Sequence, residues 1–475
     1  MRIATEMTVS LRAEYQGAEL GDQRRTQRLC DMAEAVAAKP DASIPTIFPD
    51  TAGREAAYRF LRNDKVSHEA VLDPHKQQTA KRARDAGAVI VSHDTTEFNF
   101  GTKGRKDLGN VGRGKSHGFY AHVSMAVERS DERLPLGVVA VQTHSRDGKL
   151  KREGKKPSHR KRQQDPSNEG IRWIRGVEMA AEALKDCPEV IHVMDREADN
   201  YALFSSLMLR NDRFVIRCCY DRCTVGDEHG KISRVLEAAP VVEGTREIHL
   251  SRRDTSPLPS QRNIHPPRKA RDATLAVCAV AVTVQRPDSS NRCPQRTLTL
   301  NLVRVFEPHP PEGEEPVQWD LWTTEPIDTP EQIWAIVDAY RTRWVIEEYF
   351  KVLKTGCAFE ARQLESEQNL LRALSLFIPI AWWLLTLRTL SHTAPQRPAE
   401  TLVSQVRLHC LRGALRKIKV KLPAKPSVRD VLLGIARLGG HIPRNGEPGW
   451  IVILRGMKQL LLIEEGYLLG CQEKM

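Results

Sequence analysis

The sequence predicts an α/β protein. In it, a mixed β-sheet with flanking helices is interrupted by a β-strand insertion, and both ends of the chain are helical. Three observations lead to this fold class. Two short β-branched runs, 88–91 and 190–194, each lead into an aspartate. Further along, a long amphipathic helical pattern carries a glutamate among cationic side chains. The two end segments show helical rather than strand periodicity.

The length of the chain implies several structural parts, because 475 residues are too many for one hydrophobic core. We expect helical parts at 1–71 and 369–475. Between them, 72–220 and 325–368 form the α/β part, and 221–324 interrupts it as a β insertion domain.

The net charge favours an anionic partner. The chain carries 72 Lys and Arg against 60 Asp and Glu, a formal charge of +12 at pH 7. Nucleic acid is the commonest partner of so basic a protein. Charge alone leaves ribosomal, membrane-surface and accidental basicity open.

We expect a cytoplasmic protein. Residues 1–14 mix charges and lack the apolar run of a secretory signal. The most apolar segment, 373–385, is too short to cross a bilayer and contains Pro379, so it predicts a buried helix. Ten cysteines are scattered without a CxxC pair, which favours reduced thiols over zinc or disulfides.

Cationic side chains mark two predicted helices of the amino-terminal segment. Spacings of three or four residues place such side chains on one helix face, where they can bind phosphates. They are Arg24, Arg25 and Arg28 at the start of the first helix, and Arg59 and Arg62 in the second, 53–63. The pattern fits a small DNA-binding module, and solvated surface arginines are the alternative.

Strand patterns follow. The run 88–91 predicts a buried strand ending toward Asp94, and 119–127 and 136–141 complete an antiparallel meander. The stretch from Arg146 to Arg162 is strongly basic and predicts a surface loop, with contact to a DNA backbone as an added possibility.

A helix, a strand, a second helix and a second strand come next. The first strand of this group, 190–194, ends in Asp195, and the second, 214–216, ends at Arg217. The helices are expected at 171–184 and 201–209. The segments 248–251, 273–283 and 297–305 then read as strands of the β insertion, with a Pro- and Arg-rich linker at 252–271.

The helix that follows Thr329-Pro330 and stops at Gly356 has a polar face of unusual content. Spacings of three and four residues bring its polar side chains together. They are Tyr340, Arg343, Glu347, Lys351 and Lys354, opposite the apolar Val345, Ile346, Tyr349 and Leu353. A phosphate-binding face and a solvated face with i,i+4 salt bridges both account for this pattern.

This order of elements is that of a ribonuclease-H-like sheet. There the first and fourth strands are neighbours and the last helix crosses beside them, so Asp94, Asp195 and Glu347 would converge. Three carboxylates of this kind suit Mg²⁺, and two such ions support phosphodiester chemistry. For either aspartate alone, a strand-end turn or a helix cap is the alternative.

Several short sequence motifs, which follow one order along nearly the whole chain, resemble those of the DDE transposases of bacterial insertion sequences. The resemblance is to the branch defined by a Tyr-x2-Arg-x3-Glu-x6-Lys motif, and within it to the cut-and-paste transposon-five type. The motifs are Gly21 to Leu29, Ala57 to Phe60, Asp94 to Thr96, Asp195 to Asp199, Arg213 to Arg217, Tyr340 to Gly356 and Ile435 to Gly440.

The resemblance implies a homodimer that binds transposon terminal inverted repeats and target DNA in a synaptic complex. Two Mg²⁺ ions, or Mn²⁺ in their place, would be held by Asp94, Asp195 and Glu347. Phosphate and end-DNA contacts would come from Tyr340, Arg343, Lys351 and Lys354, with Arg217 near the active site. Trp319 would stack on a flipped base during hairpin formation, and Trp322 would be a core residue, or the two would be exchanged.

Two other functions stay open on the sequence. One is a metal-dependent nuclease that cuts without joining. The other is an inactive DNA-binding inhibitor of transposition, against which the complete carboxylate set argues. The carboxy-terminal helices pair two subunits in the resembling family, and an intramolecular helical cap is the alternative.

Overall fold

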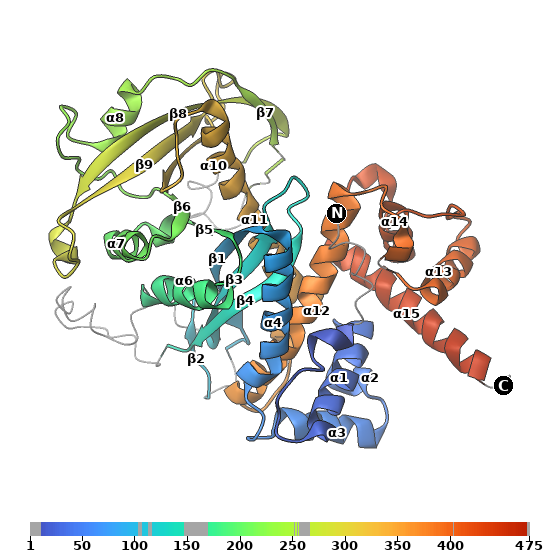
Figure 1. Ribbon diagram of the computed structural model, residues 1–475. Helices are drawn as coiled ribbons and strands as arrows, with labels where there is room; N and C mark the ends of the chain where they lie inside the picture. Colours follow the sequence, from blue (N-terminus) through green and yellow to red (C-terminus); the bar gives the residue numbers. More distant parts are fainter. Residues whose placement is uncertain are drawn as a thin grey trace. The chain divides into compact units, whose positions relative to one another are not determined.

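The computed structural model describes residues 11–102, 107–112, 116–146, 170–250, 252, 253, 255, 267–401 and 403–472 (Figure 1). The chain divides into two compact units, each described by itself below. The first comprises Met1–Lys155, Arg175–Val190 and Trp344–Met475, and the second Lys156–Ile174 and Ile191–Arg343. The predicted basic loop lies outside the described residues except for Arg146, as does most of the predicted linker 252–271.

The first unit begins with helices, as predicted. Side-chain caps set their starts, because Asp22, Asp50 and Ser67 each accept a hydrogen bond from a backbone N–H of the first turn. The elements are η2 (Leu11–Glu14), α1 (Gln23–Ala38), α2 (Ile44–Ile47), α3 (Thr51–Leu61) and α4 (His68–Ala86).

The predicted antiparallel meander is confirmed in the sheet of the first unit. Its strands are β1 (Ala88–Asn99), β3 (Ser116–Glu128) and β4 (Pro135–His144), with the unpredicted β2 (Gly109–Val111). β3 pairs antiparallel with each of the others. The helices α4 and α12 pack against β4 (Figure 1).

The prediction that the first strand ends at Asp94 is wrong. β1 continues for five residues beyond Asp94, which pairs with Val123 in mid-strand. The strand continues because β3 is as long and pairs with it up to Asn99, and because Phe98 is buried against Phe119. Asp94 is therefore held in a regular ladder rather than in a turn.

The carboxy-terminal part of the first unit is helical, as predicted. Its elements are α11 (Trp344–Lys351), the π-helical turn η5 (Val352–Gly356), η6 (Phe359–Ala361), α12 (Glu367–Thr393), α13 (Gln405–Lys417), α14 (Val428–Leu438) and α15 (Trp450–Gln472). α12 is long and apolar enough to cross a membrane, yet 94% of its most apolar window is buried inside the protein. This agrees with the buried helix predicted around Pro379.

The predicted single helix from Thr329-Pro330 to Gly356 is correct at its start and wrong in its continuity. Thr329 and Gln332 form a capping box at the start of α10 (Pro330–Thr342), and a separate α11 begins at Trp344. The Thr342 hydroxyl donates to the Asp338 carbonyl at 3.0 Å, a bond that bends helices. At the junction the Arg343 N–H donates to the carbonyl of Tyr340, three residues back, whereas a continuous α-helix would use the carbonyl of Ala339.

The second unit is built on a sheet in the order β5-β6-β10-β9-β8-β7. Its strands are β5 (Glu189–Met194), β6 (Arg213–Arg217), β7 (Arg246–Leu250), β8 (Arg271–Gln285), β9 (Thr297–Phe306) and β10 (Gln318–Thr323). β5 and β6 are parallel, and the remaining pairs are antiparallel. The helices are α6 (Ile171–Ala183), which begins in this unit, α7 (Tyr201–Leu209), α8 (Ile232–Ala238) and α10.

The strands predicted for the β insertion are present as β7, β8 and β9, and β10 pairs with β6. They therefore extend the sheet that β5 and β6 begin, rather than packing as a sheet of their own. The predicted domain boundaries stay a prediction.

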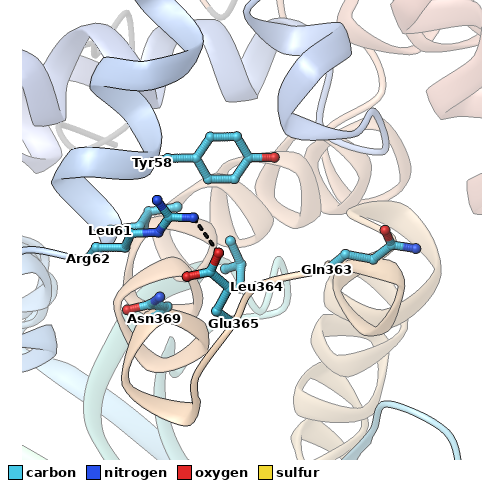
Figure 2. A pocket seen from close by; sticks show the side chains of 7 residues that line it. All are labelled: Tyr58, Leu61, Arg62, Gln363, Leu364, Glu365 and Asn369. Atoms are coloured by element: carbon cyan, nitrogen blue, oxygen red, sulfur yellow. Dashed lines mark hydrogen bonds and ion pairs between the residues drawn. The ribbon is translucent and has the colours of Figure 1, made fainter. Parts of the chain in front are cut away.

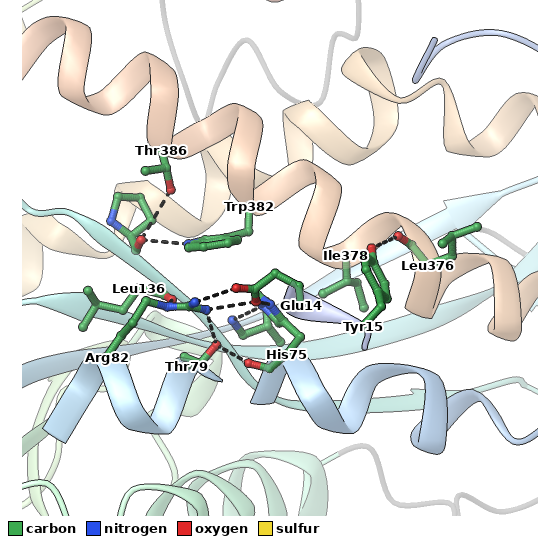
Figure 3. Close-up of polar contacts among 12 residues, drawn as sticks. Glu14, Tyr15, His75, Thr79, Arg82, Leu136, Leu376, Ile378, Trp382 and Thr386 are labelled. Carbon is green, nitrogen blue, oxygen red and sulfur yellow. Dashed lines mark hydrogen bonds and ion pairs between the residues drawn. The ribbon is translucent and has the colours of Figure 1, made fainter. Parts of the chain in front are cut away.

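A buried ionic cluster joins four segments of the first unit (Figure 3). The Glu14 carboxylate, 1% exposed, accepts hydrogen bonds from His75 Nδ1 at 2.5 Å and from Arg82 at 2.7 and 3.2 Å. His75 Nε2 accepts the N–H of Val138, so its proton resides on Nδ1. The Arg82 guanidinium lies 4.1 Å from the ring of Trp382 on α12. The cluster thereby connects η2, α4, β4 and α12.

The charge of Glu14 is maintained by its neighbours. Burial alone would raise the pKa of this carboxyl, but the hydrogen bond from His75 and the charge of Arg82 lower it to about 2. Because the folded pKa lies below the usual 4.5, the stabilisation is present above pH 4.5 and is lost as the pH falls toward 2.

Glu14→Gln should therefore lower the free energy of unfolding at pH 7 by about 3–5 kcal/mol, because Arg82 loses its buried counter-charge. Urea unfolding at several pH values measures this. The difference from wild type should shrink below pH 4.5, and the exposed control Glu55→Gln should change little. A pH-independent difference would contradict the account.

Candidate functional site

Asp94 and Glu347 both belong to the first unit, on elements that pack together. α11 contacts β1, and its buried Ile346 and Tyr349 share one apolar core with Phe98 and with Val123, the cross-strand partner of Asp94. Asp94 and Phe98 are four residues apart on one strand and so face the same side. Asp94 therefore lies on the face of β1 that α11 covers. Both carboxylates are half-buried.

Asp195 belongs to the second unit and stands at the end of β5, as predicted. Its Oδ1 accepts the N–H of Glu197 at 2.8 Å and caps the short helix η3 (Arg196–Ala198). Met194 pairs in parallel with Ile216, so Asp195 and Arg217 follow at the same level on adjacent strands. Because neighbouring strands lie roughly 4.8 Å apart, the backbone of Arg217 lies beside the backbone of Asp195.

The two tryptophans of β10 have different environments. Trp322 is fully buried, and its ring centroid lies 5.9 Å from that of Phe204 on α7. Trp319 is half-buried, three residues away and thus on the opposite sheet face. That face also carries Leu321, which pairs with Arg217. Trp322 is therefore the core residue, and Trp319 remains the candidate for stacking on a base.

The predicted polar face of the 340–354 segment is not one exposed surface. Tyr340 and Arg343 are only 7% and 8% exposed, at the end of α10. Lys351 is exposed but pairs with Glu348 at 2.5 Å rather than with Glu347, and Lys354 lies 5.8 Å from the Phe98 ring. The phosphate contacts assigned to these residues stay a prediction.

The amino-terminal arginines occupy different situations. Arg24 is exposed and pairs with Asp22 at 2.9 Å, whereas Arg25 donates to the Leu20 carbonyl at 2.7 Å. Arg28 is half-buried on α1. Arg59 and Arg62 are exposed at the carboxyl end of α3. Arg24, Arg59 and Arg62 are therefore accessible to a phosphate, and the Arg24 side chain is 91% exposed.

Figure 2 shows that Arg62 belongs to a small pocket of about 180 Å³. The guanidinium lies 5.6 Å from the Tyr58 ring and pairs with Glu365, in the segment before α12. Gln363 and Asn369 complete the polar lining. Nearby, the buried Arg372 of α12 donates to the Leu61 and Val66 carbonyls and fixes α3 to α12. Sequence reasoning missed Glu365 because it lies some 300 residues from Arg62.

The carboxylates offer suitable donors for a hard divalent cation. Asp94, Asp195 and Glu347 present only oxygen ligands, which Mg²⁺ prefers. Among the residues that the structure describes, no three His, Cys, Asp or Glu side chains are grouped so as to hold a metal ion. The metal site therefore stays a proposal.

The first helices are similar to a known family of DNA-binding segments. Residues 8–66 match a family model described as Transposase DNA-binding. The matched segment contains α1, α2 and α3, with all five predicted DNA-contacting arginines of the amino-terminal part. This segment is similar to the transposase DNA-binding family, which supports a transposase with DNA as its partner.

One solved structure found by similarity is a cryo-EM structure of the piggyBac transposase synaptic complex with hairpin DNA. The identity is 10%, the alignment covers 98% of this chain and 81% of that chain, and the TM-score is 0.34. At that TM-score the similarity carries no argument about fold or mechanism.

Arg59→Ala should weaken binding to a DNA duplex and lower the slope of log affinity against log salt by about 0.9, the loss of one phosphate contact. Titrations at several salt concentrations measure the slope on a duplex taken from the DNA flanking the gene. Lys185→Ala is the control, because this exposed lysine pairs with Glu182 on α6, outside the matched segment. An unchanged slope for Arg59→Ala would show that Arg59 is a solvated surface arginine that makes no phosphate contact.

Proposed function

We propose that this protein is a DNA transposase of the DDE type, which binds terminal inverted repeats, cuts DNA there and joins it to a target. The match of residues 8–66 to the transposase DNA-binding model carries the proposal. Within the DDE transposases, we assign the protein to the branch of bacterial insertion sequences that carries the Tyr-Arg-Glu-Lys motif. This assignment rests on the sequence motifs alone. A homodimer in a synaptic complex and a cytoplasmic location belong to the same proposal.

Asp94, Asp195 and Glu347 would hold two Mg²⁺ ions, or Mn²⁺ in their place. When bound, such ions activate an attacking oxygen and stabilise the leaving oxygen of a phosphodiester. The packing of α11 on β1 supports the pairing of Asp94 with Glu347. Their half-buried carboxylates would carry the negative charge that binds the cations.

Cationic side chains would position the DNA strand. Arg217 is the last residue of β6, at the level of Asp195, and Lys354 lies beyond α11. Each would bind a backbone phosphate near the scissile bond, with Tyr340 and Arg343 as further contacts. Such preorganised cations also stabilise charge that develops in phosphoryl transfer.

Trp319 would receive a base during a hairpin step. Unstacking a base costs a few kcal/mol, and an aromatic platform returns about 1–3 kcal/mol by stacking. The half-buried position of Trp319, on the sheet face of Leu321 and Arg217, supports this role. Trp322 is excluded from it by complete burial.

Asp94→Asn, Asp195→Asn and Glu347→Gln should each reduce cleavage of end DNA by at least roughly 10³-fold, because each removes a charged oxygen ligand from the site. Binding of the same DNA should stay within a factor of a few, since the matched DNA-binding segment is untouched. Cleavage and gel-shift assays on one duplex separate the two effects.

The matched control is Asp186→Asn, which makes the same change at an exposed aspartate of the first unit. It should cut at the wild-type rate. Near-normal cutting by any of the three site variants would remove that residue from the proposed site.

A further inference from the structure

The carboxylate of Glu348, next to Glu347 on α11, accepts hydrogen bonds from three side chains. Lys351 donates to Oε1 at 2.5 Å. Arg388 and Trp450 both donate to Oε2, at 3.2 and 3.3 Å. One carboxylate therefore joins three helices of the first unit, since Arg388 lies on α12 and Trp450 is the first residue of α15.

The donors are themselves held in place. The Arg388 guanidinium lies 4.7 Å from the Trp450 ring, a cation–π contact, and the Trp450 side chain is buried. The side chains of Glu348 and Arg388 are 34% and 21% exposed. This contact is therefore more than an exposed ion pair, which usually contributes less than about 1 kcal/mol.

α11 needs such an anchor because it is short. It has eight residues and lies between the break at Arg343 and the π-helical turn η5. Its buried side is fixed by Ile346 and by Tyr349, whose hydroxyl donates to the Ile378 carbonyl of α12 at 3.2 Å. Glu348 fixes a second side. Together the two attachments prevent rotation of α11 about its own axis, which would displace Glu347.

We propose that Glu348 is a positioning residue: with Arg388 and Trp450 it clamps α11 to α12 and α15 and thereby sets the place of Glu347. The inference rests on the proposed function, in which Glu347 is a catalytic carboxylate. It makes the first turn of α15 part of the support of the active site. A disturbance of that turn would reach the cutting step through α11. Because α15 also contacts α1, DNA affinity has to be measured beside the cutting rate.

Trp450→Phe tests the clamp with a small change, because it removes the indole N–H and keeps a buried aromatic ring. Glu348→Gln removes the charge from the same contact. Both should lower the rate of cutting at saturating DNA by roughly 10–100-fold, the size of effect expected when a catalytic group is slightly misplaced. DNA affinity and the thermal midpoint should change little. Trp383→Phe, on α12, is the control and should cut at the wild-type rate.

Two further readouts distinguish positioning from general damage. The double variant should cut no more slowly than the slower of the two single variants, because both changes break the same contact between Glu348 and Trp450. Amide hydrogen exchange should rise in 344–351 in both single variants and not in the control. Unchanged exchange in α11, wild-type cutting by both variants, or a parallel loss of DNA binding would each overturn the proposal.

The exchange measurement also keeps the two proposals apart. If the wild-type protein cuts no DNA, the proposed function fails and Glu348 has no catalytic group to position. The exchange rates would then still report whether the three-helix clamp holds α11. If the wild type cuts and α11 exchanges equally in all variants, only the clamp is wrong.

Discussion

The apolar contact between α11 and β1 is the constraint on which the candidate site depends. Ile346 and Tyr349 enter the same core as Phe98 and Val123, which fixes the helix against one face of the strand. Asp94 lies on that face, and Glu347 adjoins the buried Ile346. Hydrophobic burial of a few side chains therefore holds the helix that carries Glu347 against the strand that carries Asp94.

Local patterns predicted much of this arrangement. The β-branched runs at 88–91 and 190–194 form strands, although only the second ends at its aspartate. The apolar spacing predicted the buried Ile346 and Tyr349 of α11 and the buried Leu353 of η5. These signals succeed because strand and helix periodicities are set by the nearest few residues. The match of 8–66 to a transposase DNA-binding model agrees with the arginine pattern found there.

What the sequence did not reveal depends on distant contacts. The side-chain bond from Thr342 to the Asp338 carbonyl accompanies a helix break that the apolar spacing gave no sign of. Burial of Arg343 could not be read from a helical wheel, which treats every polar residue as exposed. Likewise, the pairing of Arg62 with Glu365 and of Glu348 with Trp450 joins segments far apart in the chain. Such pairs have no local signature.

In the proposed function, this protein cuts and joins DNA at defined ends. The most direct measurement incubates it with Mg²⁺, a target plasmid and linear DNA that carries the sequences flanking its gene. We expect free 3′ hydroxyls at the ends first and end DNA joined to the plasmid afterwards. Cutting without any joined product would identify a nuclease, and binding without cutting would identify a DNA-binding protein; either result contradicts the account.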